Sequence, residues 1–173
     1  ISATYSGSDY YMAGAASIVT QTVNPASSAL TITSAPNPSD AQQSVAFTVT
    51  VGAAAPGAGT PTGVVTVTFD AITAYTGTLL GGVATIQKSD LAVGEHTVAA
   101  DYGGDGSFNG GSAQPGTQTV QCLDAIAVAN TNDSGLGSLR RAIDDICPDG
   151  VITFDPAVFG TAQVAAICFG VGQ

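Results

Sequence analysis

The fold of this chain is decided by residues 98–120, which read VAADYGGDGSFNGGSAQPGTQTV. Moved back by 97 positions, this stretch aligns without a gap on residues 1–23, ISATYSGSDYYMAGAASIVTQTV, and nine of the 23 positions are identical. Self-similarity at a fixed period is the signature of a repeat. A repeat unit therefore runs from about Asn24 to Val120. Residues 1–23, with strands expected at 1–5 and 18–23, are the predicted last two strands of a preceding copy and candidates for complementing strands.

Alternating apolar and polar side chains predict short strands throughout the repeat unit. The pair Gly81-Gly82 suits a tight hairpin turn between residues 75–80 and 83–87, because both glycines can take positive φ. About seven short strands with regular turn signals predict an all-β fold, an antiparallel β-sandwich. The residues expected to face its core are Val45, Phe47, Val49, Val51, Val65, Val67, Phe69, His96, Val98, Ala100 and Tyr102.

The same unit carries a family resemblance. Its motifs are PNPS, TPTGVVTVTF, GGVATI, the spacing L-x-x-G-x-H-T-V-x-A-x-Y-x-G-D from Leu91 to Asp105, and the closing TQTV. Together they resemble the bacterial immunoglobulin-like (Ig-like) repeats of large secreted and cell-surface proteins. The resemblance covers residues 24–121 as one complete Ig-like β-sandwich. It implies a spacer or stalk with no catalytic site, and it does not imply a ligand.

Residues 122–173 differ in composition and are expected to form a separate segment. A strand is expected at 125–129, then a helix capped by Ser138 and ended by Pro148-Asp149-Gly150, then strands at 151–154 and 162–169. One apolar face of that helix is expected to hold Leu139, Ala142, Ile143 and Ile146. The segment, with TNDSGLGSLRRAIDD and VITFDPAVFGTAQ, resembles the N-terminal cap of right-handed parallel β-helix surface proteins, with one short helix.

The three cysteines are too far apart for a paired C-x-x-C metal site, and the sequence gives no metal or cofactor site. Cys122 and Cys147 each lie about four residues before an expected strand. Parallel stacking of those strands would bring the two sulfur atoms together, within the Cα separation of about 7 Å that a disulfide allows. A Cys122–Cys147 disulfide is therefore favoured over a Cys147–Cys168 disulfide.

The charge balance limits the partners of this chain. Thirteen acidic residues against Lys88, Arg140 and Arg141 give a formal net charge of −10. Such an excess repels phosphate backbones and anionic lipids, so neither nucleic acid nor a membrane surface is expected as a partner. No run of about 18 apolar residues occurs, so no membrane insertion is expected. Scarce lysine and three cysteines in a β-rich chain indicate a secreted or cell-surface protein.

The sequence does not predict an enzyme. His96 is the only histidine, and no activated-nucleophile motif surrounds it, so a buried histidine with satisfied hydrogen bonds is expected. Glycoside hydrolysis needs two carboxyl groups on opposite sides of one bond. Asp144 and Asp145 are expected to point to different sides of their helix, which does not provide such a pair.

The loop GGDGSFNGG contains Asp105 and Asn109 and follows Asp101, a spacing that superficially suggests calcium. The bidentate Glu of an EF-hand loop is missing. Asp101 aligns with Thr4 and Asp105 with Ser8, so the two copies do not share these groups. A glycine-rich hairpin loop stabilised by Asx turns is therefore favoured over a calcium site.

Aromatic residues recur at matching positions of the two copies. Tyr5 and Tyr102 resemble the corner tyrosine of sandwich domains, whose hydroxyl bonds to nearby backbone. Tyr10, Tyr11 and Phe108 would suit a sugar-binding loop. Tyr11 and Phe108 coincide in the alignment, so packing in a core or at a domain junction is favoured for these two.

These observations predict a non-catalytic structural module of an extracellular surface protein or fibre. Its expected partners are other copies of itself or adjacent Ig-like repeats. Unpaired strand edges at both ends would be satisfied by strand addition between copies, and head-to-tail contacts of this kind give filaments. The alternative is an adhesin or carbohydrate-binding spacer module of a large surface protein, with a glycan or cell-surface ligand.

Overall fold

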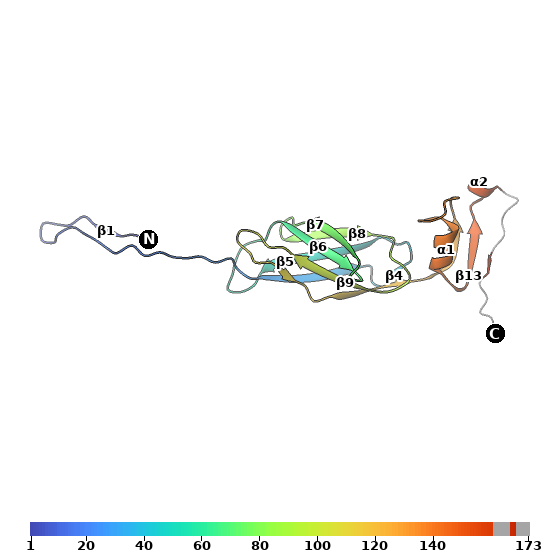
Figure 1. Cartoon of the computed structure of the whole chain (residues 1–173), viewed down its shortest axis with the longest axis horizontal. Coiled ribbons are helices and arrows are strands. Elements are labelled where there is room, and N and C mark those ends of the chain that lie inside the picture. Colours follow the sequence, from blue (N-terminus) through green and yellow to red (C-terminus); the bar gives the residue numbers. More distant parts are fainter. Residues whose placement is uncertain (161–166, 169–173) are drawn as a thin grey trace.

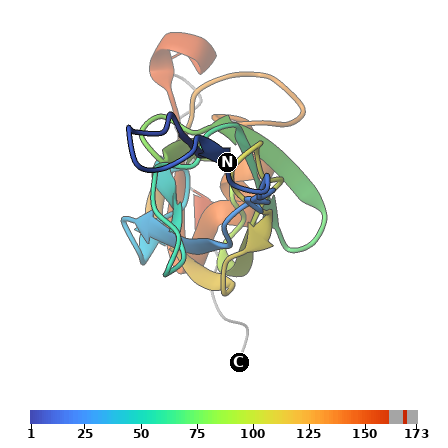
Figure 2. The ribbon, with the colours of Figure 1, turned by 90° about the vertical axis from the view of Figure 1, so that its left-hand side faces the viewer.

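A computed structural model of the chain describes residues 1–160 and 167–168. Three parts follow one another along its long axis: a hairpin formed by residues 1–19, a β-sandwich, and a small C-terminal segment (Figure 1). Figure 2 looks along that axis from the hairpin end, with the C-terminal segment behind the sandwich. The chain therefore enters the sandwich at one end and leaves it at the other.

The sandwich consists of two sheets. The larger sheet has the order β4-β11-β9-β6-β7, with β10 paired to β9, and the smaller has the order β3-β5-β8. The strands are β3 (Ser28–Ala35), β4 (Ser39–Asp40), β5 (Val45–Ala53), β6 (Val64–Phe69), β7 (Thr73–Thr78), β8 (Val83–Lys88), β9 (Gly94–Tyr102), β10 (Gly111–Ser112) and β11 (Gly116–Gln121). Within residues 24–121, seven of these have six or more residues and two have two, which agrees with the predicted number of strands.

The core lies between the two sheets and is built from the inward positions of each strand. Of the eleven residues expected to face it, ten are buried, and His96 at the start of β9 is half-buried. Phe47 of β5 meets Phe69 of β6 edge to face, with 4.8 Å between ring centroids. Strand alternation, with its period of two, therefore located the core correctly.

The turn at Gly81-Gly82 forms as expected, with φ of 62° and 79°, and Leu80 and Val83 exchange main-chain hydrogen bonds across it. The predicted hairpin is wrong, however, because the strands on either side join different sheets. β7 pairs with β6, and β8 pairs with β5. Since the sandwich needs strands in both layers, this tight turn carries the chain from one sheet to the other.

The hairpin formed by residues 1–19 also differs from expectation. Its strands are β1 (Thr4–Tyr5) and β2 (Gly14–Ala15), so the second strand precedes the predicted range 18–23. Ser8 and Tyr11 exchange main-chain hydrogen bonds across a tight turn, and the pairing of β1 with β2 continues the register of this turn. Ile1 and Val19 still exchange main-chain hydrogen bonds, after which the chain runs extended toward the sandwich (Figure 1).

The C-terminal segment is a small parallel strand pair covered by a helix. Its elements are β12 (Leu123–Val128), α1 (Leu139–Asp145), β13 (Ile146–Phe154), α2 (Pro156–Phe159) and β14 (Ile167–Cys168). β12 and β13 are parallel, as expected, whereas β14 runs antiparallel to β13. The predicted strand at 162–169 lies outside the described residues except for 167–168. Neither described helix is long and apolar enough to cross a membrane.

Two details of this segment depart from the sequence prediction. Ser138 caps α1 as expected, accepting a hydrogen bond from the main-chain N–H of Arg141. The predicted apolar face is wrong in part: Ala142 and Ile146 pack in the core of the segment, but Leu139 and Ile143 are exposed and Asp145 is buried in their place. The strand after the helix begins at Ile146 rather than after Gly150, and the four-residue helix α2 was not predicted.

Candidate interface at the two ends of the sandwich

The hairpin of residues 1–19 reproduces the local structure of β9 and β10. β1 and β2 pair Tyr5 with Gly14, and β9 and β10 pair Tyr102 with Gly111, at the same offset of 97 residues as in the sequence. Its loop is also the same, since Gly7 and Gly104 have φ of 88° and 85°. One sequence pattern therefore gives one hairpin twice, once inside the sandwich and once outside it.

Tyr102 shows what this hairpin does inside the sandwich. Its ring is 3% exposed and its hydroxyl donates to the carbonyl oxygen of Thr62 at 2.7 Å, as expected for a corner tyrosine. Burial, together with the nearby Asp105 carboxylate, raises the pKa of Tyr102. The matching Tyr5 is 51% exposed. The same side chain thus lies buried in one copy and open in the other.

The loop after Tyr102 is held by the Asp105 carboxylate. Oδ1 accepts from the main-chain N–H groups of Ser107 and Phe108 at 2.7 and 2.9 Å. Oδ2 accepts from the N–H and hydroxyl of Thr62 at 2.9 and 2.8 Å. These bonds, led by that from Ser107, hold the pKa of Asp105 well below its usual range. Asp105 is an Asx-turn residue that ties the loop after Tyr102 to Thr62, in the segment before β6.

The three side chains considered for calcium bind separate partners. Asp101 accepts from the Ser112 hydroxyl, Asp105 binds as described above, and the Asn109 amide donates to the Pro25 carbonyl oxygen at 3.1 Å. Among residues 1–160 and 167–168, no group of three or more His, Cys, Asp or Glu side chains could hold a metal ion. The described loop thus has the hydrogen bonding of a turn.

His96 lies at the opposite end of β9. Its Nδ1 is 2.7 Å from Asp70 Oδ2 and its Nε2 is 2.8 Å from the Ala92 carbonyl oxygen. Both partners only accept hydrogen bonds, so the protonated ring, in which both nitrogens donate, is the form that satisfies them together. Burial acts to lower the pKa of His96, but the bonds to Asp70 and Ala92 outweigh it and raise the pKa. Both ring nitrogens of His96 have hydrogen-bond partners, as expected, but the side chain is half-buried rather than buried in the core.

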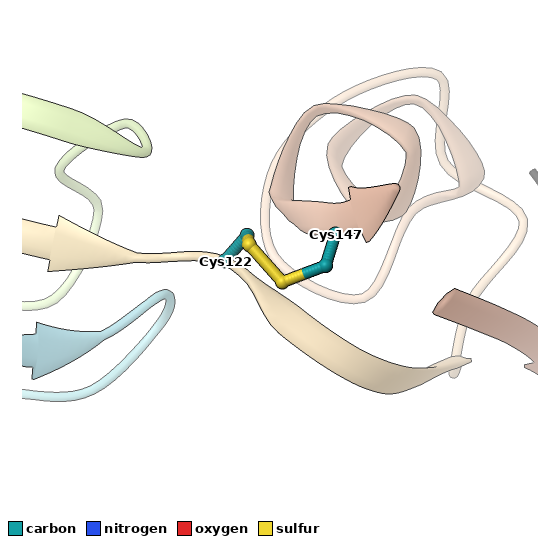
Figure 3. The surroundings of a disulfide bond; sticks show 2 residues. All are labelled: Cys122 and Cys147. Carbon is teal, nitrogen blue, oxygen red and sulfur yellow. A yellow bond between two sulfur atoms is a disulfide. The ribbon is translucent and has the colours of Figure 1, made fainter. Parts of the chain in front are cut away.

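A disulfide ties the C-terminal segment to the residue that directly follows the sandwich. Cys122 follows β11 directly, and Cys147 is the second residue of β13 (Figure 3). The two are bonded, with a Cα–Cα distance of 4.9 Å, as the parallel stacking of the strands predicted. The bond closes a loop of 25 residues that contains β12 and α1.

A buried ion pair completes this junction. Arg141 Nε donates to Asp145 Oδ2 at 2.7 Å, one turn further along α1, and Asp145 is fully buried. Gln42 of the sandwich donates to the same oxygen at 3.0 Å, and Arg141 donates to the Leu91 carbonyl oxygen at 2.6 Å. Removing one partner of such a pair is strongly destabilising, because it leaves a buried charge without compensation. Asp144 points to the exposed side, as the helix periodicity predicted.

The other end of the sandwich is joined through main-chain groups. Ala26 donates to the Ser107 carbonyl oxygen at 2.9 Å and accepts from the N–H of Asn109 at 2.8 Å. A hollow here is lined by Val23, Asn24, Pro25, Ala26, Gly57, Ala58, Gly106 and Ser107. None of these side chains titrates near neutral pH. The hollow therefore offers no acid–base group.

The comparison with known proteins decides the family. A model of the bacterial Ig-like domain (group 3) matches residues 32–121. The chain belongs to the bacterial Ig-like domain family. Comparison with curated proteins and with solved structures gives no match. Bacterial Ig-like domains are generally non-enzymatic structural modules, and they typically occur in surface or secreted proteins.

In this bacterial Ig-like domain the aromatic residues considered for sugar binding differ in their exposure. Phe108 is 5% exposed, which confirms its expected place in a core. Tyr10 and Tyr11, at the tip of the hairpin, are 91% and 72% exposed.

The contact between Gln42 and Asp145, at the other end of the sandwich, was not predicted from the sequence. The four-residue spacing of Arg141 and Asp145 was the available signal, since such pairs meet on one helix face.

Proposed function

We propose that the chain is a non-catalytic structural module of an extracellular surface protein or fibre, in which Ig-like sandwiches are strung end to end. The observation that carries this proposal is the path of the chain, which enters and leaves the sandwich at opposite ends (Figure 1). Both ends are tied down, by Ala26 at the entrance and by the disulfide at the exit. A module attached in this way holds the segments at its two ends apart and in a fixed relative orientation.

In the finer form of this proposal, copies join head to tail by strand addition and give a filament. Its support is the two-stranded sheet of β1 and β2. Neither strand pairs with any other described strand, so their outer edges are unpaired. An unpaired edge recruits strands through main-chain hydrogen bonds. The partner is another copy of the chain or an adjacent Ig-like repeat. The C-terminal segment, with its parallel β12–β13 pair, would present a β-helix-like cap at the opposite end.

Sedimentation over a wide concentration range, with electron microscopy of the same samples, tests assembly between copies. The expected result is a concentration-dependent rise in mass and filaments with a regular axial repeat. The matched control carries Thr4→Pro, because proline removes one N–H from β1 and is poorly tolerated inside a sheet. A wild-type chain that remains monomeric at the highest concentration refutes assembly between copies.

A second candidate is a carbohydrate-binding spacer, as in an adhesin, and the exposed Tyr10 favours it. Exposed tyrosine rings present both an apolar face and a hydroxyl. Phe108 has no part in such a site because it is buried, and Tyr11 occupies the matching position. Glycan-array binding that is lost in Tyr10→Ala and kept in Tyr11→Phe would support this function. Equal binding by wild type and Tyr10→Ala would refute it.

A further inference from the structure

Residues 98–120, the last part of the sandwich, include seven buried residues. These are Val98, Ala100, Tyr102, Phe108, Ala113, Gln118 and Val120. The matching residues of the first copy are Ile1, Ala3, Tyr5, Tyr11, Ala16, Gln21 and Val23, and all seven are exposed. Five of the seven positions are identical, and the other two keep an apolar or aromatic residue. Of the sixteen remaining positions, four are identical, so similarity is concentrated where the second copy faces a core.

The glutamine among these seven is the most informative. Gln118 is fully buried, and its two amide N–H groups are shared among three acceptors, the Pro36 carbonyl oxygen, Ser39 Oγ and the Thr119 carbonyl oxygen, while its Oε1 has no hydrogen-bond partner among the described residues. A buried amide is tolerated only where such acceptors are present. Gln21 already makes the local bond, to the Thr22 carbonyl oxygen at 3.0 Å. It thus has the same side chain and the same local hydrogen bond as Gln118.

Tyr5 indicates which kind of strand would pair with the free edge of β1. In the sandwich, β9 pairs antiparallel with β6, Tyr102 lies opposite Val65, and the tyrosine hydroxyl reaches the Thr62 carbonyl oxygen. β1 presents Tyr5 in the same hairpin register, which β2 fixes through Gly14. A strand equivalent to β6 therefore fits the free edge of β1.

We propose that residues 1–23 are an interaction surface for one partner, the strand set of a neighbouring repeat built like residues 24–97. The hairpin closes that sandwich in the register of residues 98–120. Ile1, Ala3 and Tyr5 face the partner's core, and Gln21 bonds to its equivalents of Pro36 and Ser39. This inference rests on the proposed function in placing the chain within an array, and it adds the face and the register of the contact.

The full chain preceded by a second copy of residues 24–97 provides the test. Hydrogen exchange is measured at the amides of β1 and β2 in this extended chain and in the original chain. The expected result is slowing by at least about 100-fold, because these amides would move from an isolated hairpin into a sandwich. Exchange that is equally fast in the two chains overturns the proposal.

Two substitutions in the extended chain test whether Tyr5 faces the core of the neighbouring repeat or β1 only lies near it. Tyr5→Asp places a charge on the core side of β1, and Thr4→Asp places it on the outer side. Tyr5→Asp is expected to abolish the slowing, whereas Thr4→Asp leaves it within about threefold, since an unpaired charge is excluded from a core. Equal effects of the two substitutions overturn the proposed register.

A second variant decides the question if the extended chain does not stay soluble. In it, residues 98–120 of the full chain are replaced by the sequence of residues 1–23. A folded monomer with a cooperative thermal transition supports the proposal, and an unfolded chain overturns it. Neither experiment depends on assembly between copies. A chain that fails to form filaments but passes these tests refutes filament assembly alone.

Discussion

The disulfide allows a quantitative prediction about the C-terminal segment. The Cys122–Cys147 bond closes a loop of 25 residues that holds β12 and α1. Restricting a loop of that length in the unfolded chain stabilises the fold by about 3.5 kcal/mol. The core of this segment has three fully buried apolar residues, Val128, Ala142 and Ile152. A core so small supplies little stability, so the disulfide provides a large share of it.

The perturbation is the double variant Cys122→Ala/Cys147→Ala, and the assay is hydrogen exchange followed by mass spectrometry. A loss of about 3.5 kcal/mol corresponds to exchange roughly 400-fold faster at amides of β12, α1 and β13 that open with the whole segment. Amides in β3 to β11 should exchange at unchanged rates, because no strand of the sandwich lies within the loop. They are the internal control.

Reduction of the wild-type chain should give the same increase in exchange, and a reductant should have no further effect on the double variant. This comparison separates the cross-link from the loss of two side chains. If the segment exchanges within about threefold of the wild-type rate after reduction, the loop-closure argument is refuted. The ion pair and the contacts with the sandwich would then suffice to hold the segment.

Three further predictions concern side chains of the sandwich and its exit junction. Tyr102→Phe should lower the free energy of unfolding by about 1 kcal/mol through loss of the hydroxyl bond, while Tyr5→Phe in the same chain should change it by under about 0.3 kcal/mol in urea titrations. The folded-state pKa of His96 is raised above the value of an unfolded histidine. Its contribution to the free energy of unfolding is therefore full below about pH 6.5 and is lost as the pH rises through the raised pKa. Thermal midpoints measured from about pH 6 to 9 should fall in wild type and fall less in His96→Gln. Asp145→Ala should destabilise the C-terminal segment by roughly 3 kcal/mol, because it leaves Arg141 without its carboxylate, and segment-resolved exchange that matches wild type would show that this ion pair is dispensable.

The sequence predicted the core better than it predicted the connections. Alternation with a period of two depends on burial alone, so ten of the eleven expected residues lie in the core. Whether two strands on either side of Gly81-Gly82 share a sheet depends on pairing with distant strands, which no local pattern contains. The end of β2 was misplaced for a related reason. Residues 18–23 alternate as a strand does, but the register of the turn between Ser8 and Tyr11 determines which residues pair.

The exit junction was predictable in part. The disulfide followed from two cysteines placed at equal distances before two parallel strands. The helix face was misjudged because apolar spacing favoured Leu139 and Ile143, whereas the sandwich supplies Gln42 and a carbonyl oxygen to bind Asp145 and Arg141. A polar contact across 103 residues of sequence cannot be read from the helix itself.

The two copies end in the same TQTV and then diverge, and this divergence determines how each following unit is attached. Cys122 stands where the first copy has Pro25, at the offset of 97. Pro25 has a fixed φ and no N–H, so the chain passes extended to Ala26, whose main chain binds the loop of the next sandwich. Cys122 instead forms a covalent bond to the next unit, and Gln42 and Arg141 add polar contacts. The residues that follow TQTV therefore give two different attachments, a main-chain contact through Ala26 in one place and a covalent bond through Cys122 in the other.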